Sequence, residues 1–411
     1  MAGHPNRAAT IFLSTVIAVL SVIVVSLAIP LQVWRSGRLE APPLDLVSGG
    51  QLVSRSSRIW IDTDAACGAT PTTDPDDCLA IVWFAAKGHN IVGISTSYGN
   101  ASADIVERTT EALVATMGNG GLPRIPVWRG AAGFLANSGK ATQPAHAVLR
   151  AELEQGPLTI LALGPLTNVA AALEGRPDLQ RNVARLIAVM GHRPGHIFHP
   201  SEGSGRGMLL GHGPIFRDLN FAKDEVAARS VLRMRLPVTL VSYDAARQVR
   251  ITADDLDRLT RLGPAFAWVA SRARGWLDYW HVDIGQPGFS PFDWVAAAYV
   301  VEPGLFGCAV TDAWIEDEWV FWLYPRPSLL VGPATPVNVT VKAEVIYCPQ
   351  ANPSLHGYLL SGEMPFVPGF WDRRGWGCGL SYITRHDDVA AVPGWWDGGW
   401  ARPGNRTSSR K

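Results

Sequence analysis

Residues 58–81 read RIWIDTDAACGATPTTDPDDCLAI, and this stretch decides how the chain folds. An apolar run ends in two carboxylates, and after a loop of small residues a second acidic group opens a segment with helical spacing. These carboxylates are Asp62, Asp64, Asp74, Asp76 and Asp77. A strand that carries carboxylates at its end, facing a helix that begins with more of them, concentrates negative charge in a small volume. Such a cluster is costly unless a cation or polar ligand compensates it, and oxygen ligands suit hard cations such as Ca²⁺ or Mg²⁺.

Helix capping explains part of this acidic pattern. Asp74 and Asp76 would cap the predicted helix, because the N-terminal end of a helix favours negative charge. Capping accounts for one or two carboxylates but leaves the others without a role. The stretch therefore predicts a cation or ligand site.

Beyond this stretch, apolar strands alternate with segments of helical periodicity. Strands are expected over 58–61, 91–97, 158–163, 184–190 and 237–242, and helices over 76–87, 101–117, 223–234, 264–279 and 291–301. This alternation predicts an α/β fold with a mostly parallel central sheet flanked by helices, in an open doubly wound arrangement. Ligand sites in such sheets lie at the carboxyl ends of the strands, where Asn100, Thr167 and Asp244 also fall.

Composition narrows the classes of function. The chain has 411 residues, 47% of them hydrophobic, and a formal net charge of zero. A nucleic-acid binder would normally carry a basic excess, so no nucleic-acid partner is expected. The five cysteines have no metal-type spacing and do not define a disulfide framework, which leaves one or two bridges open.

The N-terminus carries the clearest signal for a compartment. Residues 8–34 are almost wholly apolar and long enough to span a bilayer as a helix. We expect residues 1–34 to be a transmembrane anchor, with the remainder of the chain outside the cytoplasm. Cleavage near Ser26-Leu27-Ala28, which would make the segment a signal peptide and the protein secreted, is the alternative. Residues 35–57 have the composition of a linker.

Several motifs, taken in order, resemble those of the inosine–uridine preferring nucleoside hydrolase family. That family has an Asp-Thr-Asp strand end with a double Asp, a Gly-Asn pair, a Leu-Gly-Pro-Leu-Thr-Asn turn, a Glu-Phe-Asn segment and a late His-Asp pair. The counterparts here are Asp62-Thr63-Asp64 with Asp76-Asp77, Gly99-Asn100, Leu163–Asn168, Asp218-Leu219-Asn220 and Phe292-Asp293. The resemblance covers roughly residues 58–303. Beyond Trp314 the pattern changes to short strand-like runs and then to a Trp/Gly/Pro-rich tail, so we expect a catalytic domain over residues 58–347 and an irregular C-terminal extension over 348–411.

The resemblance also implies an activity, the Ca²⁺-dependent hydrolysis of the N-glycosidic bond of ribonucleosides to free base and ribose. One Ca²⁺ would be held by Asp64, Asp77, the backbone carbonyl of Thr167 and Asp293. Asp64 would also accept a proton from the metal-bound water that attacks the anomeric carbon, through an oxocarbenium-like transition state. The side chains predicted to bind the nucleoside substrate are Asp76, Asn100, Asn168, Asp218 and Asn220.

The first loop departs from the family pattern. The family has only a few residues between the first Asp pair and the double Asp, whereas residues 65–75 intervene here. Either Asp64 still reaches the metal across this loop, or Asp74 has partly taken its place. Asp218 replaces a longer Glu of the family, which weakens its predicted contact with the 5′-hydroxyl.

The group that protonates the leaving base is a second departure. Phe292 stands where the family often has a histidine; it can stack on a base but cannot donate a proton, or it is only an apolar residue that starts a helix. His212, which matches an upstream Asn of the family, is the first candidate for the missing catalytic acid, ahead of His192 and His281. A histidine in a glycine-rich loop is often a solvated bystander.

Two other functions remain open. A hydrophobic strand ending in Asp-x-Asp also occurs in Mg²⁺-dependent phosphohydrolases, with Asp62 as the nucleophile, but that class gives no role to Leu163–Asn168 or to Asp77. A non-catalytic ribose- or nucleoside-binding protein on the same fold is the second alternative. A homo-oligomer is also left open.

Overall fold

Strand β2 (Ile59–Thr63), the start of the acidic stretch, lies in the interior of a ten-stranded sheet. Its five residues are all buried, and its side chains alternate between two cores, with Ile59 and Ile61 in one and Trp60 in the other. This alternation follows from the pleat of a strand. The computed structural model describes residues 15–21, 43–50, 52–135, 143–194, 218–320, 324–333, 335–336 and 338–361.

The sheet has the order β1-β8-β10-β7-β6-β5-β2-β3-β4, with β9 beside β8. Six strands run parallel to β2. They are β3 (Ile91–Thr96), β4 (Val127–Arg129), β5 (Leu158–Ala162), β6 (Val183–Ala188), β7 (Val238–Leu240) and β10 (Lys342–Ala351). The antiparallel strands are β1 (Val47–Ser48), β8 (Phe306–Val320) and β9 (Tyr324–Gly332). The predicted mostly parallel sheet is therefore confirmed.

The direction of the strand order reverses at β2. The chain runs outward through β3 and β4, then returns to β5 on the other side of β2 and continues through β6 and β7. Such a reversal opens a crevice outside the carboxyl ends of the strands, which is where ligands bind in open α/β sheets. The acidic residues that follow β2 lie at this point.

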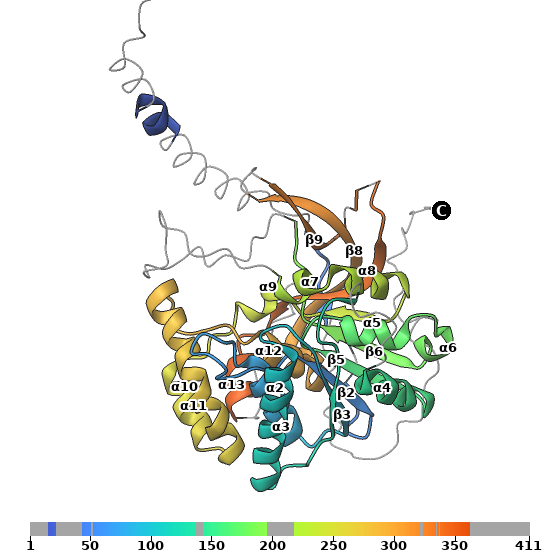
Figure 1. Cartoon of the computed structure of the whole chain (residues 1–411), viewed down its shortest axis with the longest axis vertical. Helices are drawn as coiled ribbons and strands as arrows, with labels where there is room; N and C mark the ends of the chain where they lie inside the picture. The colour runs from blue at the N-terminus through green and yellow to red at the C-terminus, as the bar shows by residue number, and fades with distance from the viewer. Residues whose placement is uncertain are drawn as a thin grey trace, which may run out of the picture. The chain divides into compact units, whose positions relative to one another are not determined.

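Helices cover both faces of the sheet (Figure 1). One core contains α2 (Asp76–Ala86), α3 (Ala103–Asn119), α10 (Ala253–Thr260), α11 (Pro264–Asp278), α12 (Phe292–Val301) and α13 (Leu355–Ser361). The other contains α4 (Pro144–Glu154), α5 (Thr167–Leu173), α6 (Pro177–Gln180) and α8 (Glu225–Arg233). Two further short helices are α7 (Leu219–Lys223), directly before α8, and α9 (Tyr243–Ala246), which follows the end of β7. The predicted flanking helices are thus confirmed.

Two predicted helices differ in detail. The helix expected over 223–234 is α8, which begins two residues later, because the Asp224 side chain accepts a hydrogen bond from the Ala227 amide (3.0 Å) and caps it; Lys223 ends the separate short helix α7. The helix expected over 264–279 continues from α11 into a π-helix (Tyr279–Ile284). Such π-helical turns are rare and frequently occur at functional sites.

The ends of the predicted catalytic domain are extended by packed segments. Within the predicted linker, β1 pairs with β8, and the carbonyl of Gly49 accepts a hydrogen bond from the Tyr299 hydroxyl (2.9 Å). The predicted boundary at residue 347 falls inside β10, and α13 follows that strand. The remainder of the predicted extension, residues 362–411, lies outside the described residues.

The predicted membrane anchor lies largely outside the described residues. Within residues 1–34 the structure describes only 15–21, which are helical. In the described part of the chain, no helix is both long and apolar enough to cross a membrane. The transmembrane helix therefore stays a prediction.

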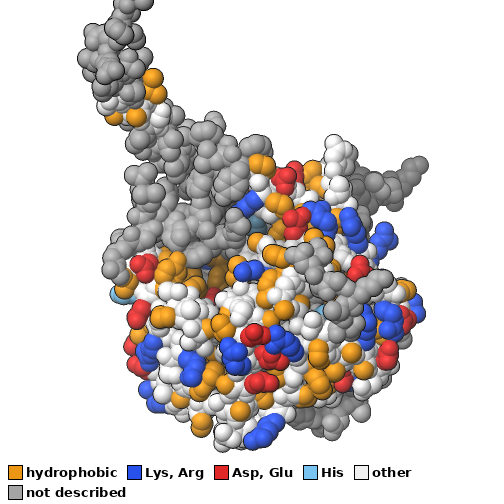
Figure 2. Space-filling model, viewed as in Figure 1, with side chains coloured by type: hydrophobic (Ala, Val, Ile, Leu, Met, Phe, Trp, Pro, Cys, Tyr) orange, Lys and Arg blue, Asp and Glu red, His pale blue; other side chains and the backbone are white. Residues whose placement is uncertain are grey.

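The described residues form two disulfides and carry charges of both signs on their surface. Cys67 is bonded to Cys78, and Cys308 on β8 to Cys348 on β10. On the face shown in Figure 2, lysine and arginine side chains are interspersed with aspartate and glutamate. A mixed surface of this kind produces no large field of one sign.

Candidate active site

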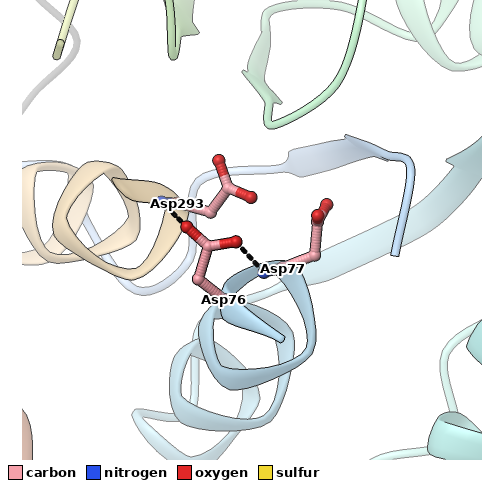
Figure 3. A group of neighbouring side chains, drawn as sticks. All are labelled: Asp76, Asp77 and Asp293. Carbon is pink, nitrogen blue, oxygen red and sulfur yellow. Dashed lines mark hydrogen bonds between the residues drawn. The ribbon is translucent and has the colours of Figure 1, made fainter. Parts of the chain in front are cut away.

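Three carboxylates meet where two helices begin. Asp76 and Asp77 occupy the first turn of α2, and Asp293 the first turn of α12 (Figure 3). One oxygen from each lies within 4.8 Å of the other two, and all three side chains are buried. We call these three residues the floor. An acidic residue at a helix N-terminus is favoured by the helix dipole, but three of them in contact repel one another.

Asp76 joins the two helices through backbone hydrogen bonds. One oxygen accepts from the Asp77 amide (3.0 Å) and the other from the Asp293 amide (3.0 Å). The side chain thus fixes the N-terminus of α12 against that of α2. This connection between residues far apart in the sequence sets the position of Asp293.

Asn100 connects the floor to the strand end. Its amide nitrogen Nδ2 donates to Asp77 Oδ2 (3.1 Å) and to Asp64 Oδ1 (3.4 Å), and its backbone amide donates to Asp64 Oδ2 (2.8 Å). Asp77 Oδ1 accepts a hydrogen bond from the Thr63 hydroxyl. Asp64 and Asp77 are therefore held together by one asparagine.

Gly99 permits this close approach. A Cβ atom at this position would lie 1.7 Å from Asp64 Oδ2, which is far shorter than any van der Waals contact. Any other residue would push the carboxylate or the strand away. The glycine of the Gly-Asn pair is thus required by the placement of Asp64.

Burial makes the ionised forms of these carboxyls costly. Burial, followed by the charge of Asp76, raises the pKa of Asp77 to about 6. Burial and the charges of Asp76 and Asp77 raise the pKa of Asp293 well above its usual range, and burial and the charge of Asp77 do the same for Asp64. A cation among them would reverse this cost, so the site has the electrostatic character of a cation site. Oxygen-only donors fit a hard divalent cation.

A cavity of about 610 Å³ opens above the floor. Its polar lining includes Asp76, Asp293, Asn100, Asp218 and Asn220. Its apolar side is formed by Ile105, Leu163, Val189, Met190, Tyr243, Trp276, Trp280 and Phe292. A volume of this size with a few convergent polar groups is typical of a small-molecule site.

Four aromatic residues belong to the lining of the cavity: Tyr243, Trp276, Trp280 and Phe292. Phe292 stacks on Tyr243 with ring centres 6.0 Å apart and an angle of 23° between the planes. Trp276 and Trp280 meet edge to face at 6.2 Å. Phe292 is thus more than an apolar residue that starts a helix, because its ring lines the cavity next to Asp293.

Two of the predicted substrate ligands line the cavity with their side chains already engaged. Asn220 Nδ2 donates to the carbonyls of Leu163 (2.6 Å) and Val189 (2.9 Å). Asp218 caps α7, with one oxygen accepting from the Phe221 amide (3.2 Å) and the other from the Gly191 amide (2.6 Å). The structure therefore gives Asp218 a capping role in addition to its place on the cavity.

Asn168 lies behind the site and does not line the cavity. It is completely buried, and its Nδ2 donates to Asp62 Oδ1 (2.7 Å) and to the Thr96 carbonyl (3.0 Å). Its Oδ1 accepts from the Ala131 amide (2.8 Å) and lies 2.9 Å from His146 Nε2. With all these groups bound to protein, Asn168 supports the strand ends and has no group left for the predicted substrate contact.

Asp62 and Thr167 are also fully buried. Asp62 accepts from Asn168 and from the Ser95 hydroxyl (2.5 Å), and burial raises its pKa to about 7. The Thr167 hydroxyl donates to Asp224 (2.7 Å), which fixes the first turn of α5. Asp244 accepts a hydrogen bond from the Tyr347 hydroxyl (2.5 Å), which joins α9 to β10.

Of the three histidines predicted as catalytic acids, the structure describes His192 and His281, and neither lines the cavity. His212 lies outside the described residues. His192 is buried beside a smaller cavity of about 110 Å³, where its Nε2 lies 3.3 Å from Glu318. His281 is exposed on the π-helix.

The lengthened loop leaves Asp64 in contact with the site. Asp64 is bound to Asn100 next to Asp77, whereas Asp74 accepts a hydrogen bond from the Asp76 amide (3.2 Å) at the start of α2. The carboxylates that converge within 4.8 Å include neither of them. Asp74 is therefore part of the cavity lining and of the helix start, in agreement with the capping alternative.

The sequence motifs did not identify the aromatic residues that line the cavity. Tyr243, Trp276 and Trp280 line it, but no motif marks them. A spacing of four residues places Trp276 and Trp280 on one side of a helix, which is also the ordinary pattern of a core-facing helix. Only the packing of α11 against the loop of residues 65–75 distinguishes a helix face that lines the cavity from one that faces the core.

A cavity with a floor of buried carboxylates, at the reversal point of a parallel sheet, is typical of an α/β enzyme that uses a divalent cation. Residues 59–345 match the model of the inosine-uridine preferring nucleoside hydrolase family, and the chain belongs to this family. Its named relatives are ribonucleoside hydrolases, enzymes that act on N-glycosyl bonds.

The similarity to individual proteins is distant but extensive. The pyrimidine-specific ribonucleoside hydrolase RihA of Citrobacter koseri is 28% identical over 271 residues, which cover 59% of this chain and 80% of the relative. RihA of Salmonella enteritidis is 25% identical over 190 residues, 45% of this chain and 54% of the relative, so the match spans about half of that protein. A plant nucleoside hydrolase structure, PpNRh1, has a TM-score of 0.57 at 19% identity over 74% of this chain and 97% of its own, a likeness of fold.

Proposed function

We propose that this protein hydrolyses the N-glycosidic bond of ribonucleosides to free base and ribose, with Ca²⁺ at the floor. The observation that carries the proposal is the convergence of Asp76, Asp77 and Asp293 beneath a cavity of about 610 Å³ in a member of this enzyme family. Buried carboxylates that repel one another suit a cation, and the cavity has room for a small ligand.

The residues that would hold Ca²⁺ are Asp77 and Asp293, together with Asp64 and the backbone carbonyl of Thr167. Their donor set consists of oxygen atoms alone, which is the chemistry that Ca²⁺ prefers. When bound, the cation supplies charge that lowers the pKa of a coordinated water and attracts hydroxyl groups of the sugar. Asn100 keeps Asp64 and Asp77 in place, because it donates to both.

The side chains divide the chemistry between them. Asp64, held by Asn100 next to Asp77, would accept the proton of the attacking water as a general base. Asp76 and Asn220 orient the ribose hydroxyls from the cavity surface, and the carboxylates of the floor stabilise the positive charge that develops on the sugar. Each carboxylate oxygen of Asp76 can accept a second hydrogen bond besides that from the backbone.

The departing base would lie against the aromatic side of the cavity. Phe292 and Tyr243 offer a stacked pair, and such faces bind planar ligands. Phe292 has no proton to donate, and no described histidine lines the cavity. His212 therefore remains the proposed acid.

A nucleoside-binding protein without catalysis is the second candidate, favoured by Phe292 in place of a proton donor. A phosphohydrolase is disfavoured, since its nucleophile would be Asp62, which is completely buried and hydrogen-bonded to Asn168 and Ser95. The two surviving candidates differ in whether the bond is broken.

Incubation of the full chain with uridine, inosine and other ribonucleosides, followed by an assay for free ribose, separates them. We expect ribose release with Ca²⁺ and little after chelation with EDTA. Binding of ribose or nucleoside in Ca²⁺ without any ribose release would contradict the hydrolase proposal and support the binding protein.

The two disulfides support a location of the domain outside the cytoplasm, anchored by the N-terminal segment or secreted. Such bonds form and persist in oxidising compartments. Protease treatment of intact cells is the test: we expect cleavage of an anchored domain from outside, or its recovery from the medium. Protection from protease together with absence from the medium would contradict this location.

A further inference from the structure

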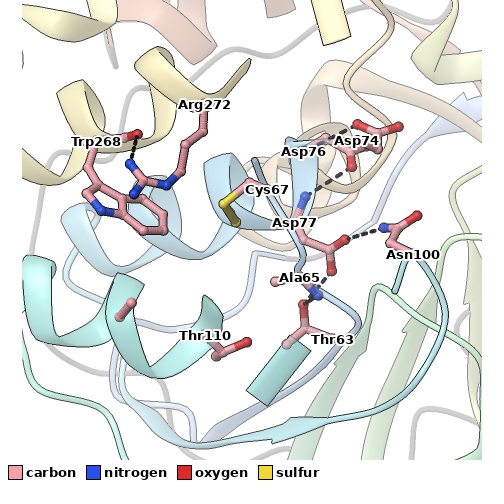
Figure 4. The surroundings of a disulfide bond; sticks show 12 residues. Thr63, Ala65, Cys67, Asp74, Asp76, Asp77, Asn100, Thr110, Trp268 and Arg272 are labelled. Atoms are coloured by element: carbon pink, nitrogen blue, oxygen red, sulfur yellow. Dashed lines mark hydrogen bonds between the residues drawn. A yellow bond between two sulfur atoms is a disulfide. The ribbon is translucent and has the colours of Figure 1, made fainter. Parts of the chain in front are cut away.

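The lengthened loop of residues 65–75 is closed onto helix α2 by the Cys67–Cys78 disulfide (Figure 4). Cys78 follows Asp77 in the first turn of α2, and both cysteines are buried. The disulfide thus ties the loop to the turn of helix that carries two floor carboxylates.

This loop forms one side of the cavity. Its lining members are Ala69, Thr70, Thr72, Thr73 and Asp74. The hydrogen bonds within it are local: the Ala69 amide donates to the Ala66 carbonyl (2.9 Å), and the Thr70 and Thr73 hydroxyls lie 2.7 Å apart. Local bonds shape the loop, but attachments to other elements decide where it lies.

Helix α11 provides the second attachment. A Cβ at Gly68, where φ is +74°, would lie 2.7 Å from Arg272 Cγ, and a Cβ at Gly275 would lie 2.4 Å from the Pro71 carbonyl oxygen. The Arg272 guanidinium in turn lies 3.6 Å from the centre of the Trp268 ring. Loop and helix are therefore in direct backbone contact next to Trp276, which lines the cavity.

Helix α2 itself does not depend on the disulfide. Residues 76–85 of this helix are buried, and α2 packs against α12. Breaking the disulfide would therefore remove one of the loop's two attachments while leaving the floor in place.

We propose that the Cys67–Cys78 disulfide is a positioning device for substrate specificity. It holds residues 69–74 against α11, so that they form with Trp276 and Trp280 a single surface, which we call the wall. Because the floor attracts the ribose hydroxyls, the wall faces the base of the nucleoside and sets how tightly it binds. This inference rests on the proposed function and deepens it, since the cysteines act through the loop and touch no substrate.

The test compares two double variants of the full chain. In C67S/C78S we expect the KM for the preferred nucleoside to rise about tenfold, the loss of roughly 1.4 kcal/mol of binding, with kcat changed less than about twofold. The matched control is C308S/C348S, which removes a disulfide between two strands that are already paired, and its KM should match that of the wild type. An unchanged KM in C67S/C78S, or a fall in kcat alone, would overturn the inference.

A second variant keeps the disulfide and displaces the wall. In Gly275→Ala the new methyl group collides with the Pro71 carbonyl, and we expect a similar rise in KM with unchanged Ca²⁺ affinity in calorimetric titration. An unchanged KM here would also overturn the inference. If the wild-type chain released no ribose from any nucleoside, the proposed function would fail together with the inference, whereas hydrolysis with unaffected variants would overturn the inference alone.

Discussion

The floor and the wall of the cavity are built in different ways. Each floor carboxylate sits on the first turn of a helix, and Asp76 accepts hydrogen bonds from backbone amides of both α2 and α12. The wall consists of a loop and two tryptophans that are held by packing on α11 and by one disulfide. Fixed helix ends give oxygen atoms precise positions, as a cation requires, whereas a packed loop can change shape without moving them.

This difference predicts which kinetic constant each region controls. Changes in the floor should remove interactions made in the transition state and lower kcat, whereas changes in the wall should alter the binding of substrate and raise KM. The variants and conditions below change the floor, its charge or the packing behind the wall.

The largest effect is expected from Asp77→Asn. It keeps the shape of the side chain but removes a charge from the floor, so that hydrolysis should fall roughly 100-fold or more, since a metal supplies several kcal/mol of charge stabilisation. Steady-state kinetics and Ca²⁺ titration measure the loss. Asp254→Asn, on the exposed start of α10, is the matched control and should behave as wild type. Full activity of Asp77→Asn would break the assignment of the floor.

A smaller loss is expected from Gly99→Ala. The new methyl group would occupy the position of Asp64 Oδ2, 1.7 Å away, and displace that carboxylate from Asn100. Disturbing a supporting contact of this kind typically costs about 10–100-fold in metal affinity or activity. Gly133→Ala, where a Cβ meets nothing within 4 Å, is the control. Equal kcat values for the two variants would show that the position of Asp64 does not matter for catalysis.

The stability of the floor should depend on pH and Ca²⁺ together. The folded pKa of Asp77, about 6, lies above that of an unfolded carboxyl, about 3.9. Without a cation, this contribution to stability is present at low pH and is lost as the pH rises through about 6. In EDTA, Tm should therefore fall as the pH rises from about 4 to about 6.

Ca²⁺ should reverse that loss, because it binds the ionised carboxylates. At 100-fold excess over Kd it adds about 2.7 kcal/mol, or roughly 3 °C in Tm for a chain of this size, at pH 8 and less at pH 5. Thermal unfolding by circular dichroism measures both shifts. A Ca²⁺ effect of equal size at the two pH values would argue against a floor that titrates.

The smallest effect concerns the support behind the wall. Helix α11 packs on α10, and α13 is joined to α10 by the His356 Nε2–Asp255 Oδ2 contact (3.0 Å). Burial alone would raise the pKa of Asp255, but hydrogen bonds from His356 and Thr252 outweigh it and lower this pKa. The stabilisation is thus present above the usual carboxyl pKa and is lost as the pH falls through the lower, folded value.

His356→Ala should therefore destabilise the fold by about 1 kcal/mol at pH 7, because His356 is partly exposed and Thr252 continues to bind Asp255. The difference from wild type should vanish in strong acid. Urea unfolding at the two pH values measures it. If His356→Ala is still less stable than the wild type in acid, the lost stability comes from packing of α13 and not from the contact with Asp255.

The sequence was sufficient for the sheet and its flanking helices, since apolar runs and helical spacing are local patterns. The acidic pattern also marked Asp76 and Asp77 at the start of α2, whereas Asp293 was predicted only through the family resemblance. Asn168 illustrates the limit: its place in the motif does not reveal that four partners occupy it behind the strand ends. The wall escaped prediction because Trp276 lines the cavity only through contact with a loop more than 200 positions earlier in the chain.

The pairing of the cysteines could not be predicted either, because it also depends on contacts between separate parts of the chain. Five cysteines allow several pairings, and only the fold of the loop brings Cys67 to the first turn of α2. Likewise, the effect of the lengthened loop on Asp64 depends on Gly99 and Asn100, which follow a different strand.

The most direct test of the central claim is a crystal structure of the protein with Ca²⁺ and ribose. We predict one Ca²⁺ in contact with Asp77 and Asp293 on the floor, with Asp64 rather than Asp74 completing its carboxylate ligands and ribose hydroxyls directed toward it. A Ca²⁺ ion bound through Asp74, or a floor that holds no ion at saturating Ca²⁺, would contradict the account.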